Sequence, residues 1–422
     1  MQRPLPDIAD FAALGLPQGI VNALTEARIT RPSPIQARTV PDALAGRDIL
    51  GRAQTGSGKT LAFGLPLVVR LSKSAPAKAP RGLVLVPTRE LADQVASAIE
   101  PAARVVGLRV LVVVGGASMS RQIAELRRGV DIIVATPGRL LDLLNRRDTN
   151  LREISVAVID EADHMADLGF LPAVSQILDA TPSNRQCMLF SATLDGDVDK
   201  LASRYLQRPA FHAVDNTNAA DMQHRVFRLA RQDKLAVAAE IAVRPARTLF
   251  FVRTKHGADR LARQLRARGV DAGAIHGNLN QNQRRRALDA FASGQARVLI
   301  ATDVAARGIH VDDVDLVVHF DPPKDHKDYL HRSGRTARAG ASGTVLSLVE
   351  PEQVAQLAQL HRTAQVKAQV SSVSSGHPDV RALAASGEAI DVPVSRPAAP
   401  RTTSSRPGNS SRRRPARSSA RR

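Results

Sequence analysis

Residues 48–60 read DILGRAQTGSGKT, in which an apolar run is followed by a glycine-rich turn and then by Lys59-Thr60. The apolar run predicts a buried strand, and the residues after the turn open a segment with helical spacing. Glycines in such a turn let consecutive backbone N–H groups face phosphate oxygens, and the helix N-terminus adds positive potential. The segment Ala53–Thr60 therefore predicts a phosphate-binding loop, with Lys59 on the β- and γ-phosphates and the Thr60 hydroxyl on Mg²⁺. The generic pattern has Gly where this chain has Ala53, and a glycine-rich turn that binds nothing is the alternative.

This loop belongs to a series of apolar runs that alternate with segments of helical spacing. The runs are rich in Val, Ile and Leu and nearly continuous, as expected of strands buried on both faces of a parallel sheet. The pattern predicts an α/β fold over residues 1–212, a doubly wound, mostly parallel sheet with helices on both faces. The predicted strands are Asp48–Ala53, Gly82–Pro87, Arg109–Val114, Asp131–Ala135, Val156–Asp160 and Met188–Ser191, and the helices include Arg89–Ala103, Met119–Arg127 and Arg139–Leu144.

A second series begins after a stretch around Asn216–Asp221, whose composition predicts a linker at residues 213–222. Residues 223–368 are then expected to form a second domain of the same architecture. From Gln369 the pattern gives way to Ser, Pro, Ala and Arg, so residues 369–422 are predicted to be a disordered basic tail. The strands of the second series are Thr248–Val252, Asp271–Ile275, Val298–Ala301, Asp315–Phe320 and Gly343–Leu348, with helices such as Gly257–Arg268 and Gln283–Ser293.

Length and composition set further limits. At 422 residues the chain is too long for one ordinary core, so two domains are expected. Apolar stretches such as Leu108–Val114 are far shorter than the roughly 20 residues of a membrane helix, and the first residues contain no signal-peptide pattern. The single cysteine, Cys187, cannot form an internal disulfide. These features favour a cytoplasmic location with no membrane partner, and we expect a monomer.

The net charge of +19 favours a polyanionic partner, nucleic acid before membrane. Part of it is local, because residues 401–422 hold eight arginines and no acid, which leaves +19 − 8 = +11 for the rest of the chain. The alternative is a solvated, solubilising surface.

An acidic cluster, Asp160-Glu161-Ala162-Asp163, stands at the carboxyl end of a predicted strand, where α/β folds bind ligands. Phosphoryl transfer needs one carboxylate to hold Mg²⁺ and a neighbour to orient the attacking water. We assign Asp160 to the metal and Glu161 to the water. Such a cluster can also be a helix cap, but its pairing with the phosphate loop favours catalysis.

The segment HRSGRTAR at residues 331–338 places Arg335 and Arg338 three residues apart. Arginines at this spacing project from one face of a helix or turn and could meet a single γ-phosphate. Their position in the second domain would make domain closure a condition of catalysis. A basic surface patch is the alternative.

Further short motifs run along both predicted domains in a fixed order. They are Phe11, Pro32–Gln36, AQTGSGKT (53–60), PTREL (87–91), Gly115-Gly116, TPGR (136–139), DEAD (160–163), SAT (191–193), Phe251–Thr254, Gln281 with Arg284, ATD (301–303) with Arg307-Gly308, and HRSGRTAR. In this order they resemble the DEAD-box RNA helicases of helicase superfamily 2, over roughly Phe11 to Leu360. The resemblance implies two tandem RecA-like domains, ATP and Mg²⁺ as cofactors and RNA as partner. The resemblance also accounts for Ala53, because this family has Ala where the generic phosphate-loop pattern has Gly.

The resemblance implies roles for residues at the nucleotide. A segment at residues 9–37 reads adenine, with Gln36 on the base edge and Phe11 packing nearby. Arg335 and Arg338 act as arginine fingers, and His331 contacts the DEAD segment on closure. The phosphate loop binds through Ala53, Gln54, Thr55, Gly56, Ser57, Gly58, Lys59 and Thr60. Hydrolysis is coupled to RNA binding through Asp163, Ser191, Ala192 and Thr193.

The resemblance also implies RNA contacts through sugar and phosphate, which explain sequence-independent binding and a preference for RNA. In the first domain they fall at Pro87, Thr88, Arg89, Gly115, Gly116, Thr136, Pro137, Gly138 and Arg139. In the second domain they fall at Arg253, Gln281, Arg284, Thr302, Asp303 and Arg307. Three positions depart from the family's pattern: Arg28, Ile29 and His310 stand where the family usually has Gly, an aromatic residue and Asp.

The expected function is an ATP-dependent RNA helicase that unwinds short duplexes or remodels RNA–protein complexes, with ribosomal or RNA-decay proteins as possible partners. The arginine-rich tail would tether RNA electrostatically, unless it serves only solubility. Three other functions stay open: an ATP-gated RNA clamp with little unwinding, a DNA-directed motor of the same superfamily, and a passive RNA-annealing protein that depends on the tail.

Overall fold

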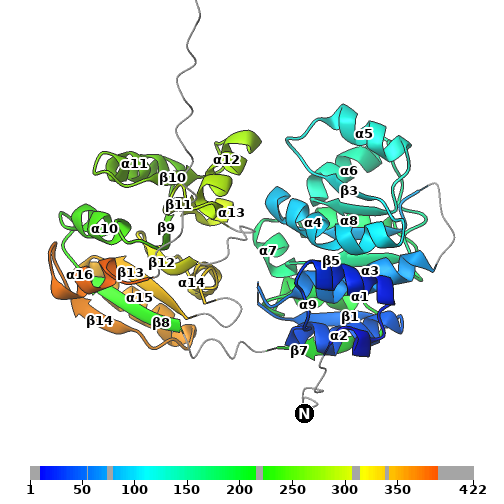
Figure 1. The fold of residues 1–422 in the computed structure, drawn as a ribbon, viewed down its shortest axis with the longest axis horizontal. Helices are drawn as coiled ribbons and strands as arrows, with labels where there is room; N and C mark the ends of the chain where they lie inside the picture. Colours follow the sequence, from blue (N-terminus) through cyan, green and yellow to red (C-terminus); the bar gives the residue numbers. More distant parts are fainter. Residues whose placement is uncertain are drawn as a thin grey trace, which may run out of the picture. The chain divides into compact units, whose positions relative to one another are not determined.

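The computed structural model describes residues 10–54, 56–73, 79–214, 222–306, 314–337 and 342–387 (Figure 1). Its strands form two seven-stranded sheets, ordered β3-β4-β2-β5-β6-β1-β7 and β10-β11-β9-β12-β13-β8-β14. The strand pairs in both sheets are parallel, for example β1 with β6 and β8 with β13. The predicted architecture of two tandem doubly wound α/β units is therefore confirmed.

The first sheet is buried on both faces, which explains its continuous apolar strands. Within β2, Val84 packs in one core and its neighbours Leu83 and Leu85 pack in the other. The strands are β1 (Ile49–Arg52), β2 (Gly82–Leu85), β3 (Val110–Val113), β4 (Ile132–Ala135), β5 (Val156–Ile159), β6 (Gln186–Ser191) and β7 (Ala210–Ala213). One face is covered by η1 (Ala12–Leu14), α1 (Gln18–Glu26), α2 (Pro34–Leu44), α3 (Lys59–Ser72) and α4 (Arg89–Val105). The other is covered by α5 (Met119–Arg127), α6 (Pro137–Asn145), α7 (Ala162–Asp167), α8 (Leu171–Asp179) and α9 (Asp197–Tyr205).

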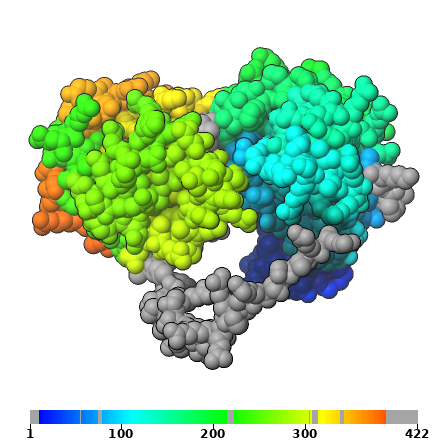
Figure 2. Space-filling view, turned by 90° about the horizontal axis from the view of Figure 1, so that it is seen from above, coloured from blue at the N-terminus to red at the C-terminus, as the bar shows by residue number. Residues whose placement is uncertain are grey.

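The second sheet is built in the same way. Its strands are β8 (Met222–Arg228), β9 (Arg247–Val252), β10 (Ala272–Ile275), β11 (Val298–Thr302), β12 (Val314–His319), β13 (Gly343–Val349) and β14 (Gln369–Ser372). Its helices are α10 (Lys234–Ala242), α11 (Lys255–Arg266), α12 (Gln281–Ala292), α13 (Asp303–Ala306), α14 (His326–Ser333), η3 (Pro351–Gln353), α15 (Val354–Thr363) and α16 (Pro378–Ala384). The polar helices α5, in cyan, and α12, in yellow-green, lie on the surface that Figure 2 shows.

The prediction that the chain is disordered from Gln369 onward is wrong for β14 and α16. Strand β14 pairs with β8, and Val373, Val380 and Leu383 are buried in the core of the second sheet. The guanidinium of Arg244 also donates to the Ser386 carbonyl at 3.0 Å. This short segment buries enough apolar area because it packs on an existing core. The rest of the predicted tail, residues 388–422, lies outside the described residues, as do residues 215–221 of the predicted linker.

Three strands were not predicted, and all lie at one side of their sheets. Strands β7 and β14 are edge strands, and β8 lies next to β14. Their alternating or polar sequences, such as Gln369–Ser372, match strands that are only partly buried. Among the described residues no helix is long and apolar enough to cross a membrane.

Candidate active site

The phosphate loop joins the end of β1 to the start of α3. Gly56 and Gly58 have φ angles of 88° and 93°, which strongly favour glycine. The start of α2 holds the loop: Gln36 Nε2 donates to the Gly58 carbonyl at 2.9 Å, and Ser33 Oγ donates to the Ser57 carbonyl at 2.7 Å. A Cβ on Gly58 would lie 2.6 Å from Gln36 Nε2, so glycine is required by contact as well as by conformation. Thr55 lies outside the described residues.

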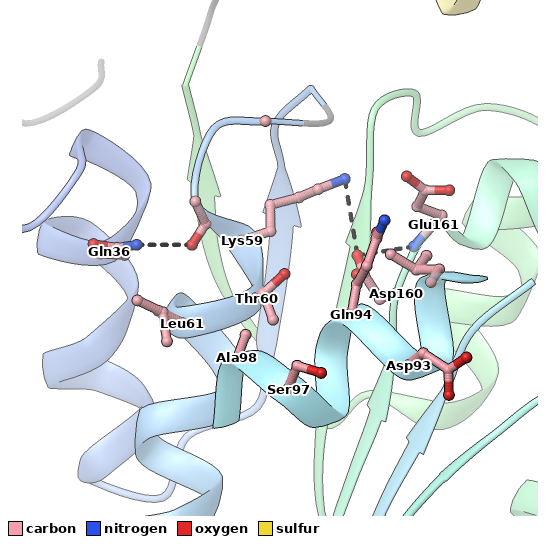
Figure 3. Close-up of a pocket in the computed structure, with 13 residues that line it drawn as sticks. Gln36, Lys59, Thr60, Leu61, Asp93, Gln94, Ser97, Ala98, Asp160 and Glu161 are labelled. Carbon is pink, nitrogen blue, oxygen red and sulfur yellow. Dashed lines mark hydrogen bonds and ion pairs between the residues drawn. The ribbon is translucent and has the colours of Figure 1, made fainter. Parts of the chain in front are cut away.

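Lys59 is the first residue of α3 and is only 5% exposed. Its Nζ lies 3.8 Å from Asp160 Oδ1 and has no hydrogen-bond partner among the described residues. Figure 3 shows Lys59 and Asp160 pointing toward one another across a hollow of about 630 Å³. A buried ammonium without a hydrogen bond is costly unless a ligand supplies one. The phosphates of a nucleotide fit this position, and Thr60 and Asp160 are suited to hold Mg²⁺ between them.

The two adjacent carboxyl groups of the acidic cluster have opposite pKa shifts. Burial raises the pKa of Asp160 to about 6, although the positive charge of Lys59 acts to lower it. Burial alone would also raise the pKa of Glu161, but the hydrogen bond and charge of His164, then Lys59 and Arg335, lower it overall. His164 Nδ1 lies 3.1 Å from Glu161 Oε2. Glu161 also has a φ of 53°, which is uncommon for a non-glycine residue.

Asp163 connects the acidic cluster to the segment 191–193. Its Oδ2 accepts from the backbone N–H of Ala192 at 3.2 Å and of Thr193 at 3.1 Å. Its own backbone N–H donates to Ser191 Oγ at 3.2 Å. These hydrogen bonds tie the acidic cluster to the segment after β6.

Residues of the second half also reach these carboxylates. His331 Nε2 lies 3.9 Å from Asp163 Oδ2. Arg335 is 6% exposed, and its charge lowers the pKa of Glu161. Arg338, the other predicted arginine finger, lies outside the described residues, as do Arg307 and His310.

The predicted RNA residues of the first half follow three neighbouring strands. Pro87, Thr88 and Arg89 follow β2, Gly115 and Gly116 follow β3, and Thr136, Pro137, Gly138 and Arg139 follow β4. These strands are adjacent in the sheet, so their carboxyl ends bring the three segments together. The Arg89 guanidinium lies against Gly116, since a Cβ on Gly116 would be only 2.0 Å from Arg89 Nη1. Arg139 Nη1 donates to the Ala117 carbonyl at 3.1 Å.

The predicted RNA residues of the second half are partly engaged in protein contacts. Gln281 Nε2 donates to Glu90 Oε1 at 3.2 Å, and Arg284 Nη2 lies 3.2 Å from Glu90 Oε2. Asp303 accepts from Arg332 Nη2 at 2.9 Å. Thr302 is buried at the end of β11, and the backbone N–H of Arg253 donates to Asp321.

Phe11, predicted to pack near the adenine, and Ile29, one of the departures from the family's pattern, lie away from the hollow. Phe11 is 1% exposed and packs in the core beside η1, and Ile29 packs against the same core. Neither lines the hollow beside Lys59. Ala53 is also buried, and its N–H donates to the Ser191 carbonyl at 3.0 Å.

Sequence reasoning gave no role to His164 or Glu90. His164 stands three residues after Glu161, a spacing that brings side chains together on a helix and could have indicated the contact. Glu90 lies within the quoted segment PTREL, but its contacts with Gln281 and Arg284 join residues far apart in the sequence. No local pattern could have indicated them.

Two sheets of matching strand order, of which only the first carries a phosphate loop, define the class of ATPases with tandem RecA-like domains. Comparison with known proteins gives the same class. Residues 33–201 match the DEAD/DEAH box helicase family, and residues 232–340 match the helicase conserved C-terminal domain. The chain is 37% identical over 361 residues to the DEAD-box ATP-dependent RNA helicase CshA of Geobacillus kaustophilus, covering 85% of this chain and 77% of that one. It is 41% identical to DEAD-box ATP-dependent RNA helicase 30 of Arabidopsis thaliana, covering 79% and 58% of the two chains.

Solved structures agree. Dbp5 of S. cerevisiae bound to RNA and ADP BeF3 superposes with a TM-score of 0.79 at 28% identity, covering 89% of this chain and all of that one. Mss116p bound to ssRNA and AMP-PNP gives 0.76 at 25% identity, covering 90% and 82%. The chain therefore belongs to the DEAD-box ATP-dependent RNA helicases and is an ATPase.

Proposed function

We propose that this helicase hydrolyses ATP to ADP and phosphate in the hollow beside Lys59, and that it uses this reaction to unwind short RNA duplexes or remodel RNA–protein complexes. The observation that carries the proposal is the buried Lys59 ammonium, which has no hydrogen-bond partner among the described residues. It faces two carboxylates, Asp160 and Glu161, at the carboxyl end of β5. A triphosphate would supply the missing acceptors.

The side chains divide the reaction among them. Lys59 and the N–H groups at the start of α3 bind the β- and γ-phosphates. Thr60 and Asp160 would hold Mg²⁺, which neutralises charge on the phosphates when bound. Glu161 positions the attacking water. Because its pKa is lowered, Glu161 is a weak base and orients the water rather than deprotonating it before attack. The water oxygen bonds to the γ-phosphorus, the bond to the β–γ bridging oxygen breaks, and the proton leaves with the phosphate.

Arg335 and His331 make hydrolysis depend on the second half. Arg335 places positive charge near Glu161, where charge spreads over the γ-phosphoryl oxygens in the transition state. His331 approaches Asp163, which is bonded to Ala192 and Thr193. We assign Arg338, which the structure does not describe, to the same function.

RNA would lie along the carboxyl ends of β2, β3 and β4. Arg89, Gly116 and Arg139 offer guanidinium and backbone groups there, which suit phosphate and sugar oxygens. In the second half, Gln281 and Arg284 would exchange their contacts with Glu90 for contacts with RNA. Binding RNA and ATP together would favour closure, and loss of the γ-phosphate would release the strand.

The test is RNA-stimulated ATPase activity together with unwinding of a short duplex. Glu161→Gln keeps the shape of the site but weakens water positioning, so hydrolysis should fall at least about 100-fold while ATP still binds. If Glu161→Gln hydrolyses ATP at the normal RNA-stimulated rate, the proposed roles are wrong. Arg335→Gln should lower turnover with little effect on ATP affinity.

An ATP-gated RNA clamp is the second candidate, favoured by the partial burial of the second-half RNA residues. Multiple-turnover unwinding separates the two functions, because a clamp releases RNA slowly and cannot recycle. We also propose a cytoplasmic location, monomeric action and ribosomal or RNA-decay protein partners. Crosslinking the protein in cells and sequencing the attached RNA would test the pathway.

A further inference from the structure

The first half has a second hollow, of about 440 Å³, at the amino ends of its strands. It lies where the chain enters β1, β6 and β7, whereas the phosphate loop follows the other end of β1. The 4 residues of β1 separate the two places by about 13 Å. The hollow is therefore distinct from the nucleotide site.

Four arginines, Arg47, Arg70, Arg185 and Arg208, line this hollow, and Asp48 is the one acid among its lining residues. The side-chain charge of the lining is thus +4 − 1 = +3. We call this set the arginine pocket. Arg47 shares its charge with Asp42 outside the lining, at 3.0 Å.

The one carboxylate in the floor of the arginine pocket already accepts hydrogen bonds from the protein. Asp48 Oδ1 accepts from the Cys187 N–H at 2.8 Å, and Oδ2 accepts from the Gln207 N–H at 2.6 Å. Gln186 Nε2 donates to the carbonyls of Ala43 at 2.9 Å and Arg47 at 2.6 Å. These bonds tie together the segments before β1, β6 and β7. They also engage both oxygens of Asp48, the one acid of the lining.

Two of the four arginines, Arg70 and Arg185, are held in place by contacts with the protein. The Arg70 guanidinium lies over Gly46, so closely that a Cβ there would be 2.8 Å from Nη1. Arg185 Nη1 donates to the Pro182 carbonyl at 2.8 Å, and its guanidinium lies 5.8 Å from the Tyr205 ring centroid. Arg185 Nε is buried and has no hydrogen-bond partner among the described residues. Arg208 is exposed and has a φ of 45°, which is unusual for a non-glycine residue.

We propose that the arginine pocket binds a compact oligophosphate, a chain of two or three linked phosphates that is either free or at the 5′ end of an RNA. Guanidinium groups bind phosphate oxygens in pairs, and several arginines converging on a hollow match a group with several negative charges. An extended RNA backbone suits an open surface such as the carboxyl ends of β2, β3 and β4. A hollow of this volume suits a small ligand instead.

The experiment titrates the full chain with sodium tripolyphosphate by calorimetry at low salt, with excess ADP filling the nucleotide site. The pocket variant is Arg70→Gln with Arg208→Ala. The matched control is Arg104→Ala with Arg128→Ala, which removes two exposed arginines of the same half that do not line the pocket. Both proteins keep the basic tail, so its contribution cancels. The pocket variant should bind tripolyphosphate about tenfold or more weakly than the control, because each lost charged hydrogen bond weakens binding.

A second arm compares two RNAs of one sequence, with a 5′-triphosphate or a 5′-hydroxyl. If the control protein prefers the triphosphate RNA and the pocket variant does not, the RNA end is the source of the oligophosphate. If neither protein distinguishes the RNAs but tripolyphosphate affinity falls in the variant, the free anion is the source. Equal tripolyphosphate affinity of the pocket variant and the control would overturn the proposal. Circular dichroism checks folding, and Arg208→Ala alone replaces the double variant if Arg70→Gln does not fold.

Discussion

Strand β1 is in sixth position across the first sheet and leads into α3, whose first residue is Lys59. Strand β8 has the same position across the second sheet and leads into α10, whose first residue is Lys234. Both lysines are buried, with exposures of 5% and 8%. Each has an acid after the fourth strand: Asp160 follows β5, and Asp321 follows β12. The two halves therefore place a lysine and an acid at the same positions of the same architecture.

The difference lies in the residues before each lysine. Gly56 and Gly58 have positive φ angles and bend the chain into a loop before Lys59. Asp233, which precedes Lys234, has a φ of −84°, and no glycine stands between β8 and α10. Lys234 instead lies over the ring of Phe320, with Nζ 5.0 Å from the centroid. The architecture supplies the lysine and the acid, but the glycines create the hollow for a phosphate.

The largest expected effect comes from making one substitution in both halves. Lys59→Met should lower RNA-stimulated ATP hydrolysis by roughly 10²–10³-fold, because a preorganised charge on the transferring phosphate is lost. Lys234→Met should leave the rate within about threefold, because Lys234 lies over an aromatic ring and does not line the hollow beside Lys59. Steady-state phosphate release measures both. A large loss of turnover in Lys234→Met would show that the second lysine has a catalytic role after all.

A smaller effect should follow from placing alanine directly before each lysine. Gly58→Ala forces a Cβ to within 2.6 Å of Gln36 Nε2 at a φ of 93°. The strain costs about 1–3 kcal/mol, so nucleotide affinity should fall roughly 10- to 100-fold. Fluorescent ADP binding measures this. Asp233→Ala, the matched change in the second half, should bind nucleotide like the unaltered protein, and equal affinity of both variants would refute the role of the glycine turn.

The sequence predicted the central strands of both sheets and the phosphate loop well, because these features are local. Continuous apolar runs such as Val156–Ile159 indicate burial on both faces, and the spacing of Gly56, Gly58 and Lys59 is contained in a few residues. It did not predict β8 or α16, whose stability depends on packing against distant elements. The same limit applies to the arginine pocket. Its floor is tied by bonds such as Asp48 to Cys187 and to Gln207, between residues well over a hundred positions apart.

The acid sensitivity of the two halves should also differ. In the first half the pKa of Asp160 is raised and that of Glu161 is lowered, so their effects on stability oppose one another. In the second half, three imidazoles surround Tyr329: His224 Nδ1 lies 2.6 Å from its hydroxyl, and the rings of His319 and His361 lie 5.1 and 4.8 Å from its ring. Burial, then the charge of His361, lowers the pKa of His224 to about 4. The pKa of His319 is also well below its usual value, chiefly because the ring is buried and then because of the charges of Arg332 and the other two histidines.

Lowered histidine pKa values make the second half less stable in acid. An unfolded histidine binds a proton near pH 6.5, whereas folded His224 does so only near pH 4. Between these values the unfolded chain holds more protons, so stability is full above pH 6.5 and falls as the pH drops toward 4. The melting temperature at pH 5 should be several degrees below that at pH 7.5, because each kcal/mol lost from the free energy of unfolding lowers it by about 2–4 °C. His224→Gln keeps a polar partner for Tyr329 and should flatten this dependence; an unchanged slope would exclude His224 as a source of it.

The smallest expected effect concerns the stability provided by Lys234. Burial lowers the pKa of Lys234 overall, and Asp321 and Glu350 offset this only in part, so part of the cost of burying the ammonium is left for the Phe320 ring to offset. Lys234→Met keeps the apolar stem and removes the charge, so the free energy of unfolding should fall by about 1 kcal/mol, the scale of a partly buried cation–π contact. Urea unfolding measures this change, with Lys255→Met, an exposed lysine of the same half, as the control. If Lys234→Met is instead as stable as the control, the Phe320 contact contributes nothing. The lysine would then occupy the position of Lys59 without a ligand to bind or a structure to stabilise.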